Sequence, residues 1–188
     1  GEWHGFSSSR NNNLVFRLDF GNSINNTPTI INLGNLNGLA SQPKDIRFIR
    51  ENGDWYGILT NYGGSNIVRL FFGNSLTNIP TGENLGNLSG WNTLRGMDLV
   101  QSNDSLILIV SSYSNSKLTL VNFGNSIANT PAPSDILDIG GSEGLINRPM
   151  GVDLEQDGGH WYGIVSSYSA NKAVFMDRDG VINFDPNR

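Results

Sequence analysis

The sequence predicts an all-β protein built from about four copies of one module, each with four short strands. The segment Phe-Gly-Asn-Ser occurs three times, starting at Phe20, Phe72 and Phe123, at spacings of 52 and 51 residues. A unit of that length is a single supersecondary module. Clusters of Gly, Asn, Pro or Ser interrupt the chain about every ten residues, and no stretch has the 3.6-residue apolar rhythm of an amphipathic helix.

Each copy has its elements in the same order. An apolar strand ends in Phe-Gly-Asn-Ser, and an Asn and Pro turn and a further strand follow. Next come a segment of alternating apolar residues and an aromatic strand, which opens at Trp3, Trp55 or Trp161 in three copies. Asn52-Gly53 and Asp157-Gly158 are the expected hairpin corners, because both residue types accept left-handed backbone angles. The repeats run approximately over residues 1–41, 42–93, 94–147 and 148–188 and form a single repeat domain.

This order of segments resembles one blade of a β-propeller of the NHL or YVTN kind. In the last copy the resemblance implies strand a from Gly151 to Leu154, strand b from Trp161 to Tyr168, strand c from Ala173 to Met176 and strand d from about Val181 to Phe184. Radial stacking of blades buries apolar faces that no single blade buries alone. The implied fold is a β-propeller-type array of about four four-stranded blades.

The number of blades is small for a closed ring. The first copy starts at strand b with Trp3, whereas most propellers of the kind that the chain resembles close with six to eight blades. We expect either a fragment of a larger ring or a protomer that completes the ring by self-association, because an open array exposes apolar blade faces. Phe20, Phe72 and Phe123 are expected to pack between blades, and the glycine after each to occupy a tight turn.

A longer sequence motif indicates the cellular location of the protein. Phe-Gly-Asn-Ser-(Ile/Leu)-x-Asn-x-Pro, with Asn-Leu-Gly-Asn downstream and Trp-Tyr-Gly-Ile before the next turn, is similar to repeats of large secreted bacterial proteins associated with gliding and cell-surface adhesion. That resemblance implies export by the type 9 route and an extracellular location on the bacterial surface. The sequence has no apolar run of the length that a membrane span needs, so membrane insertion is not expected.

Charge and cysteine content exclude several kinds of site. The formal net charge is −5 and the pI is about 4.8, with only three lysines, so no basic stripe is available to neutralise phosphates and nucleic acid is excluded as a partner. The absence of cysteine excludes disulfides, zinc–thiolate sites and thiol chemistry.

The sequence shows no distinct catalytic constellation. His4 and His160 are the two histidines, and both lie at or beside the repeated aromatic position of strand b, which favours a rim or packing role. No Gly-x-Ser-x-Gly segment occurs. A Ser-His-Asp site stays open, because such sites are defined by geometry. We therefore predict that the protein is not an enzyme; the alternative is a propeller-fold hydrolase or lyase with its active site above the central channel.

One segment near the C-terminus matches a catalytic motif. Residues 174–183 resemble the first motif of haloacid dehalogenase-type phosphatases, which would make Asp177 a nucleophile and Asp179 a general acid/base around Mg²⁺. Only nine residues follow Asp179, and Ala173-Val174-Phe175 is in repeat register with Leu14-Val15-Phe16. A blade strand followed by a turn is the favoured interpretation.

The candidate ligand-binding residues are the aromatic residues at the start of strand b. Flat rings beside amides suit the faces and hydroxyls of sugars, although the same rings also suit the core between blades, which is the favoured role for each Trp. These candidates are Trp3, Trp55, Tyr56, Trp161 and Tyr162.

Acidic clusters provide candidate ligands for a hard cation. Asp177, Asp179 and Asp185 form one cluster, and residues 153–157 hold another, so Ca²⁺ is the one cofactor that the sequence leaves open. Taken with the aromatic residues, the sequence predicts a non-enzymatic recognition, adhesion or structural repeat module of a bacterial surface protein, whose partner is a glycan or a protein surface.

Overall fold

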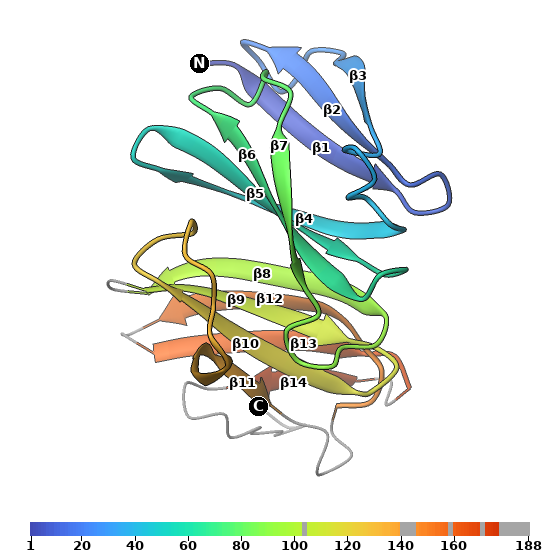
Figure 1. Ribbon diagram of the computed structural model, residues 1–188, viewed down its shortest axis with the longest axis vertical. Coiled ribbons are helices and arrows are strands. Elements are labelled where there is room, and N and C mark those ends of the chain that lie inside the picture. Colours follow the sequence, from blue (N-terminus) through green and yellow to red (C-terminus); the bar gives the residue numbers. More distant parts are fainter. Residues whose placement is uncertain (103–104, 140–145, 158–159, 170–171, 177–188) are drawn as a thin grey trace. The chain divides into compact units, whose positions relative to one another are not determined.

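The chain folds almost entirely into antiparallel β-sheets (Figure 1). The computed structural model describes residues 1–102, 105–139, 146–157, 160–169 and 172–176. These residues contain no α-helix, and one 3₁₀ turn, η1 (Pro133–Asp135), is the single helical element among them. The all-β prediction is confirmed. The chain divides into two compact units, residues 1–87 and 88–188, and each is described by itself.

Unit 1 holds two sheets, each an antiparallel meander in which sequence neighbours pair. The first sheet, coloured blue in Figure 1, has the order β1 (Trp3–Ser9), β2 (Leu14–Gly21) and β3 (Thr29–Gly34). The second has the order β4 (Pro43–Glu51), β5 (Asp54–Asn61), β6 (Asn66–Gly73) and β7 (Thr81–Gly86). The strands β4 to β7 are thus the a, b, c and d strands of one predicted blade, and β1 is the b strand of the blade before it.

Unit 2 repeats the same order of strands. Its first sheet consists of β8 (Leu94–Ser102), β9 (Ser105–Ser112), β10 (Lys117–Gly124) and β11 (Ile136–Ile139). Its second consists of β12 (Pro149–Asp157), β13 (His160–Ser167) and β14 (Lys172–Met176). These last three are the predicted strands a, b and c, with strand a longer than predicted. The predicted strand d at residues 181–184 lies outside the described residues.

The Phe-Gly-Asn-Ser repeat forms the connection between strands c and d. In each copy the glycine has φ +67°, a left-handed conformation that favours glycine. Six residues after each Phe, an Asn side chain donates from Nδ2 to the backbone carbonyl of that Phe at 2.8 Å. The three donors are Asn26, Asn78 and Asn129. The motif recurs because the loop needs one left-handed residue and one amide that closes it.

We predict that Gly73→Ala destabilises the protein by about 1–2 kcal/mol, because an L residue pays that cost at a left-handed φ. An added Cβ would meet only Asn78 Nδ2, at an ordinary contact distance of 3.6 Å, so the cost comes from the backbone rather than from a clash. The neighbouring Asn74→Ala, at an exposed position, should change the free energy of unfolding far less. Urea unfolding of both variants tests this, and equal effects would contradict the role given to the glycine.

Aromatic packing joins the two sheets of unit 1. Phe6 of β1, Phe48 of β4 and Phe72 of β6 form a trio with ring centroids 4.3, 5.6 and 5.7 Å apart. Phe72 and Phe123 are each 2% exposed, and the ring contacts of Phe72 with both sheets confirm the packing role predicted for it. Phe20, at the same repeat position, is only partly buried. The prediction that Phe20 packs between blades is therefore wrong in part, because its sheet has no a strand among the described residues to cover the ring.

Unit 2 has its own apolar core. Ile109 and Leu118 of its first sheet form one buried cluster with Val152 and Val165 of the second, and Ile146 belongs to the same cluster. Each unit is therefore a pair of blades joined through their faces, as radial stacking requires. Within the described part of the chain, no helix has the length and apolar character needed to cross a bilayer.

Candidate functional site

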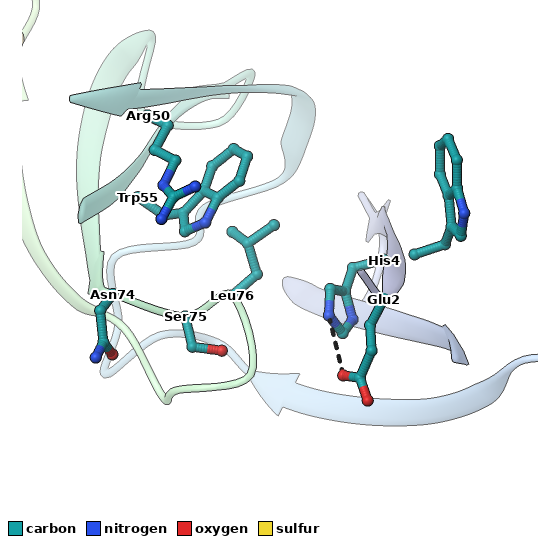
Figure 2. A pocket seen from close by; sticks show the side chains of 8 residues that line it. Glu2, His4, Arg50, Trp55, Asn74, Ser75 and Leu76 are labelled. Atoms are coloured by element: carbon teal, nitrogen blue, oxygen red, sulfur yellow. Dashed lines mark ion pairs between the residues drawn. The ribbon is translucent and has the colours of Figure 1, made fainter. Parts of the chain in front are cut away.

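An open pocket of about 450 Å³ lies in unit 1, where the start of β1 meets the β4–β5 hairpin and the loop after β6 (Figure 2). Residues from both sheets contribute to it. Its lining consists of Glu2, Trp3, His4, Arg50, Trp55, Asn74, Ser75 and Leu76. Two indoles, an imidazole, a carboxylate, a guanidinium and an amide thus border one hollow.

Trp55 and Arg50 form one side of this pocket. They are directly opposite each other in the β4–β5 ladder, and the guanidinium carbon of Arg50 lies 5.8 Å from the indole centroid. Figure 2 shows the two side chains next to one another, with Leu76 between the indole and the opposite side of the pocket. Trp55 also packs against the unit 1 core, whereas Arg50 is exposed. The core thus holds the indole in place and leaves part of it facing the pocket.

Glu2, Trp3 and His4 form the other side. Trp3 is the first residue of β1, as Trp161 and Trp55 are near the start of their own b strands, and its side chain is 55% exposed. The repeated tryptophans of the two sheets of unit 1, Trp3 and Trp55, therefore line the same pocket. The favoured packing role is therefore wrong for Trp3, and partly right for Trp55.

A chain of polar contacts fixes His4. Arg17, only 7% exposed, donates from Nε and Nη2 to the two carboxylate oxygens of Asp19, at 2.7 and 3.0 Å. The hydrogen bond from Arg17 lowers the pKa of Asp19 below its ordinary value. Burial opposes this change, and the hydrogen bond from His4 and the electrostatic influence of Arg17 and His4 add to it. Asp19 is therefore an ionised acceptor, so His4 Nδ1, 2.7 Å away, must donate the proton. His4 Nε2 is left 3.8 Å from Glu2 Oε2.

Arg17 also connects the two sheets of unit 1. Its Nη1 donates to the backbone carbonyls of Leu76 and Thr77 at 3.1 and 2.8 Å. Both carbonyls belong to the loop between β6 and β7, which carries Asn74, Ser75 and Leu76 into the pocket. One buried guanidinium therefore positions His4 through Asp19 and the opposing loop through its backbone.

A second pocket, of about 440 Å³, shares Glu2 and His4 with the first. Its remaining lining is rich in hydroxyl, amide and backbone groups from the end of β2 and the loops nearby: Asp19, Phe20, Gly21, Asn26, Thr27, Thr29 and Thr77. A ligand with hydroxyl groups would meet acceptors and donors in both pockets.

The structure brings together two of the five predicted ligand-binding residues. Tyr56 follows Trp55 and so lies on the opposite face of β5, where its ring is 5.1 Å from that of Phe71. Tyr162 belongs to unit 2 and is 42% exposed. The side chain of Trp161 lies outside the described residues.

The predicted cation ligands Asp177, Asp179 and Asp185 likewise lie outside the described residues, so that prediction stays untested. In the part of the chain that the structure does describe, no three His, Asp or Glu side chains gather into a set that could hold a metal ion.

Sequence reasoning missed Glu2, Arg17, Asp19 and Arg50, and gave His4 a rim or packing role. One feature of the sequence could have identified the pair of His4 and Asp19. The repeat places Phe71 and Asn122 where the first copy has Asp19, so the carboxylate is a departure from the repeat. Because β1 and β2 form a hairpin in which His4 is opposite Asp19, that departure identifies the pair.

The network around Asp19 predicts acid sensitivity. A carboxyl whose pKa is lowered by folding contributes stability above its unfolded pKa, and this contribution is lost as pH falls through the lower, folded pKa. The free energy of unfolding should therefore fall below about pH 4, and Asp19→Asn should remove part of that fall. Urea midpoints between pH 2 and 7 test this. The same acid dependence in Asp19→Asn as in the wild type would contradict it.

Comparison with known proteins identifies the fold. No family model matches the chain, and no curated protein matches it. Among solved structures it is similar to a GH43 β-1,3-galactosidase with galactodeoxynojirimycin, at a TM-score of 0.64 and 13% identity, over 95% of this chain and 70% of that one. A chain of a nidogen/laminin complex aligns over 92% of this chain and 75% of that one, at 13% identity and a TM-score of 0.35.

The first of these likenesses shows that the chain has a β-propeller fold. The second is too weak to carry an argument. The finer resemblance to NHL or YVTN blades, and to gliding-associated repeats, stays a prediction.

Proposed function

We propose that the pocket of unit 1 binds a carbohydrate chain and that the protein is a non-enzymatic recognition module. The observation that carries this proposal is that Trp3 and Trp55, at equivalent positions of neighbouring sheets, line one open pocket together with polar side chains. Extracellular location on a bacterial surface is part of the proposal and is supported only by the similarity of the repeats to those of adhesion-associated proteins.

The chemistry of the lining suits a sugar. Indole faces pack against the C–H faces of pyranose rings, and the groups around them can bind ring hydroxyls. Arg50 and Asn74 supply donors, Glu2 supplies acceptors, and His4 presents a nitrogen whose role is set by its bond to Asp19. The galactosidase structure was solved with a sugar analogue, which supports this ligand class by analogy of fold alone.

A propeller-fold glycoside hydrolase is the second candidate, and the likeness to the galactosidase favours it. Glycoside hydrolysis uses a pair of carboxyl groups, one of which has a raised pKa so that it stays protonated as the acid. The carboxyl group of Asp19, which lines the adjoining second pocket, is bound by Arg17 and His4, and its pKa is lowered. A lowered pKa does not suit the protonated acid, so in a hydrolase Glu2 would have to be that acid.

The experiment is a binding screen followed by calorimetry. The screen covers galactan, insoluble bacterial polysaccharides and a carbohydrate array. The oligosaccharide that binds best is then titrated into the wild type and two variants. Trp55→Ala should weaken binding at least about tenfold, or about 1.4 kcal/mol. Tyr56→Ala, the next residue but outside the pocket, is the matched control and should bind like the wild type.

Because Trp55 also contacts the core, Trp3→Ala serves as a second variant at an exposed position, and it too should weaken binding. Unchanged affinity in both Trp variants would show that this pocket is not the carbohydrate-binding site. Release of reducing sugar that is abolished by Glu2→Gln would replace recognition by the hydrolase alternative.

A further inference from the structure

At the ends of the b strands β5, β9 and β13, two adjacent polar side chains bind the a strand of the same sheet. In the second sheet of unit 1, Thr60 Oγ1 accepts from the backbone N–H of Asp45 at 3.1 Å, and Asn61 Oδ1 accepts from the N–H of Ser41 at 3.0 Å. Ser41 lies in the loop that leads into β4. Two side-chain acceptors therefore supplement the ladder between β4 and β5 at the point where the a strand begins.

The same pair recurs in both sheets of unit 2. Ser111 and Ser112 Oγ accept from the N–H groups of Gly96 and Asn92 at 2.9 and 2.8 Å. In the last sheet, Ser166 Oγ accepts from Gly151 N–H at 2.8 Å, and Ser167 Oγ accepts from Asn147 N–H at 2.9 Å. In every case the two donors are four residues apart in the chain.

In the first sheet, the described residues include the equivalents of these acceptors but no a strand. Repeat register places Ser8 and Ser9 of β1 where Thr60 and Asn61 lie in β5. Among the described residues, β1 is the edge strand, with β2 as its one ladder partner. Ser8 Oγ donates to the carbonyl of Lys44 in the next sheet at 3.3 Å, as Ser111 Oγ donates to that of Met150 at 2.9 Å. A hydroxyl oxygen that donates once can still accept an N–H.

Besides the hydroxyls of Ser8 and Ser9, the first sheet has an apolar surface formed by Gly5 and Phe20. In the second sheet the ring of Phe48, from the a strand, covers Gly57 and Phe72: a Cβ on Gly57 would lie 3.2 Å from Phe48 Cε1 and 3.5 Å from Phe72 Cε2. The first sheet has Gly5 and Phe20 at these positions, and a Cβ on Gly5 would lie 3.4 Å from Phe20 Cε2. Phe72 is 2% exposed, whereas Phe20 stays partly exposed.

We propose that the edge of β1 that has no ladder partner among the described residues binds an extended peptide strand of the same type as the a strand of this repeat. Such a strand supplies two N–H groups four residues apart, which reach Ser9 and Ser8. It also has a bulky apolar residue three positions after the second N–H, as in Asp45 to Phe48, Gly96 to Leu99 and Gly151 to Leu154. Main-chain hydrogen bonds to an exposed strand edge provide affinity, and the apolar surface of Gly5 and Phe20 selects the bulky apolar residue.

The test uses the 188-residue protein and a fluorescent synthetic peptide with the sequence of residues 39–51. Anisotropy should show saturable binding. Methylating the backbone nitrogen of the peptide's Asp45 removes one donor and should weaken binding at least tenfold, as should changing its Phe48 to Ala. In the protein, Ser8→Ala combined with Ser9→Ala should weaken binding similarly, whereas Ser7→Ala, an exposed neighbour on β1, should not.

The peptide variants keep the test valid even if the double Ser variant is less stable. Absence of saturable binding, or equal binding of the N-methylated peptide, would overturn the proposal. So would equal binding of a scrambled peptide, which would mean that the edge accepts unrelated strands. A stable dimer in sedimentation that excess peptide does not dissociate would also overturn it, in favour of pairing between two β1 edges.

Discussion

Phe72→Ala should lower the free energy of unfolding by about 3–5 kcal/mol, the cost typical of truncating a buried aromatic side chain. Phe72 is 2% exposed and contacts Phe6 of the neighbouring sheet and Phe48 of β4, the a strand of its own sheet. The truncation would therefore open a cavity between two blades. Because rigid β-sheets lie on both sides, the cavity should collapse only partly. Denaturant unfolding followed by circular dichroism measures the change.

The chain provides two controls for this substitution. Phe71, the adjacent residue, is 41% exposed, so Phe71→Ala should cost much less. Phe20→Ala removes the same repeat residue from a sheet where the ring is only partly buried, and should give an intermediate loss. Equal losses for all three would mean that the repeated Phe does not pack between blades.

Arg17→Met should lower the free energy of unfolding by about 2–3 kcal/mol, because it leaves charge-assisted hydrogen bonds unmade at partly buried acceptors. The substitution keeps the apolar part of the side chain but removes the donors to Asp19 and to the carbonyls of Leu76 and Thr77. The cost should therefore come from lost hydrogen bonds rather than from a cavity.

Arg69→Met is the matched control for Arg17→Met. Arg69 occupies the same repeat position in the second sheet, and its ion-pair partner Glu83 is more than half exposed, so the control should lose at most about 1 kcal/mol. The loss in Arg17→Met should also shrink at acid pH, where Asp19 is protonated. An effect independent of pH and equal to that of Arg69→Met would contradict the linking role of Arg17.

The repeat made most of the fold predictable. Strand order, the positions of the Asn52-Gly53 corner and the Phe-Gly-Asn-Ser turn depend on local backbone chemistry, and the structure places Asn52 and Gly53 at φ 51° and 94°. Burial of Phe72 follows from the same period. The partial exposure of Phe20 agrees with the sequence of the first copy, which starts at strand b, and among the described residues no a strand covers the ring.

The candidate site was predictable only where it repeats. Trp3 and Trp55 were found because they share a repeat position, but their convergence on one pocket depends on how neighbouring sheets stack. The contact between Arg17 and the carbonyl of Leu76 spans 59 residues and joins two sheets. His4 and Asp19 are paired by hairpin register, which a search for repeated residues does not reveal.

The proposal that Trp3 and Trp55 together bind carbohydrate is tested most directly by the indole N–H signals of ¹⁵N-labelled protein. The chain has four tryptophans, and Trp91 is an internal reference because it is 3% exposed and donates to Thr119 Oγ1 at 2.9 Å. Titration with the oligosaccharide found by the screen should shift the signals of Trp3 and Trp55 with one shared dissociation constant and leave Trp91 unmoved. Saturable binding that leaves the Trp3 and Trp55 signals in place would contradict the account.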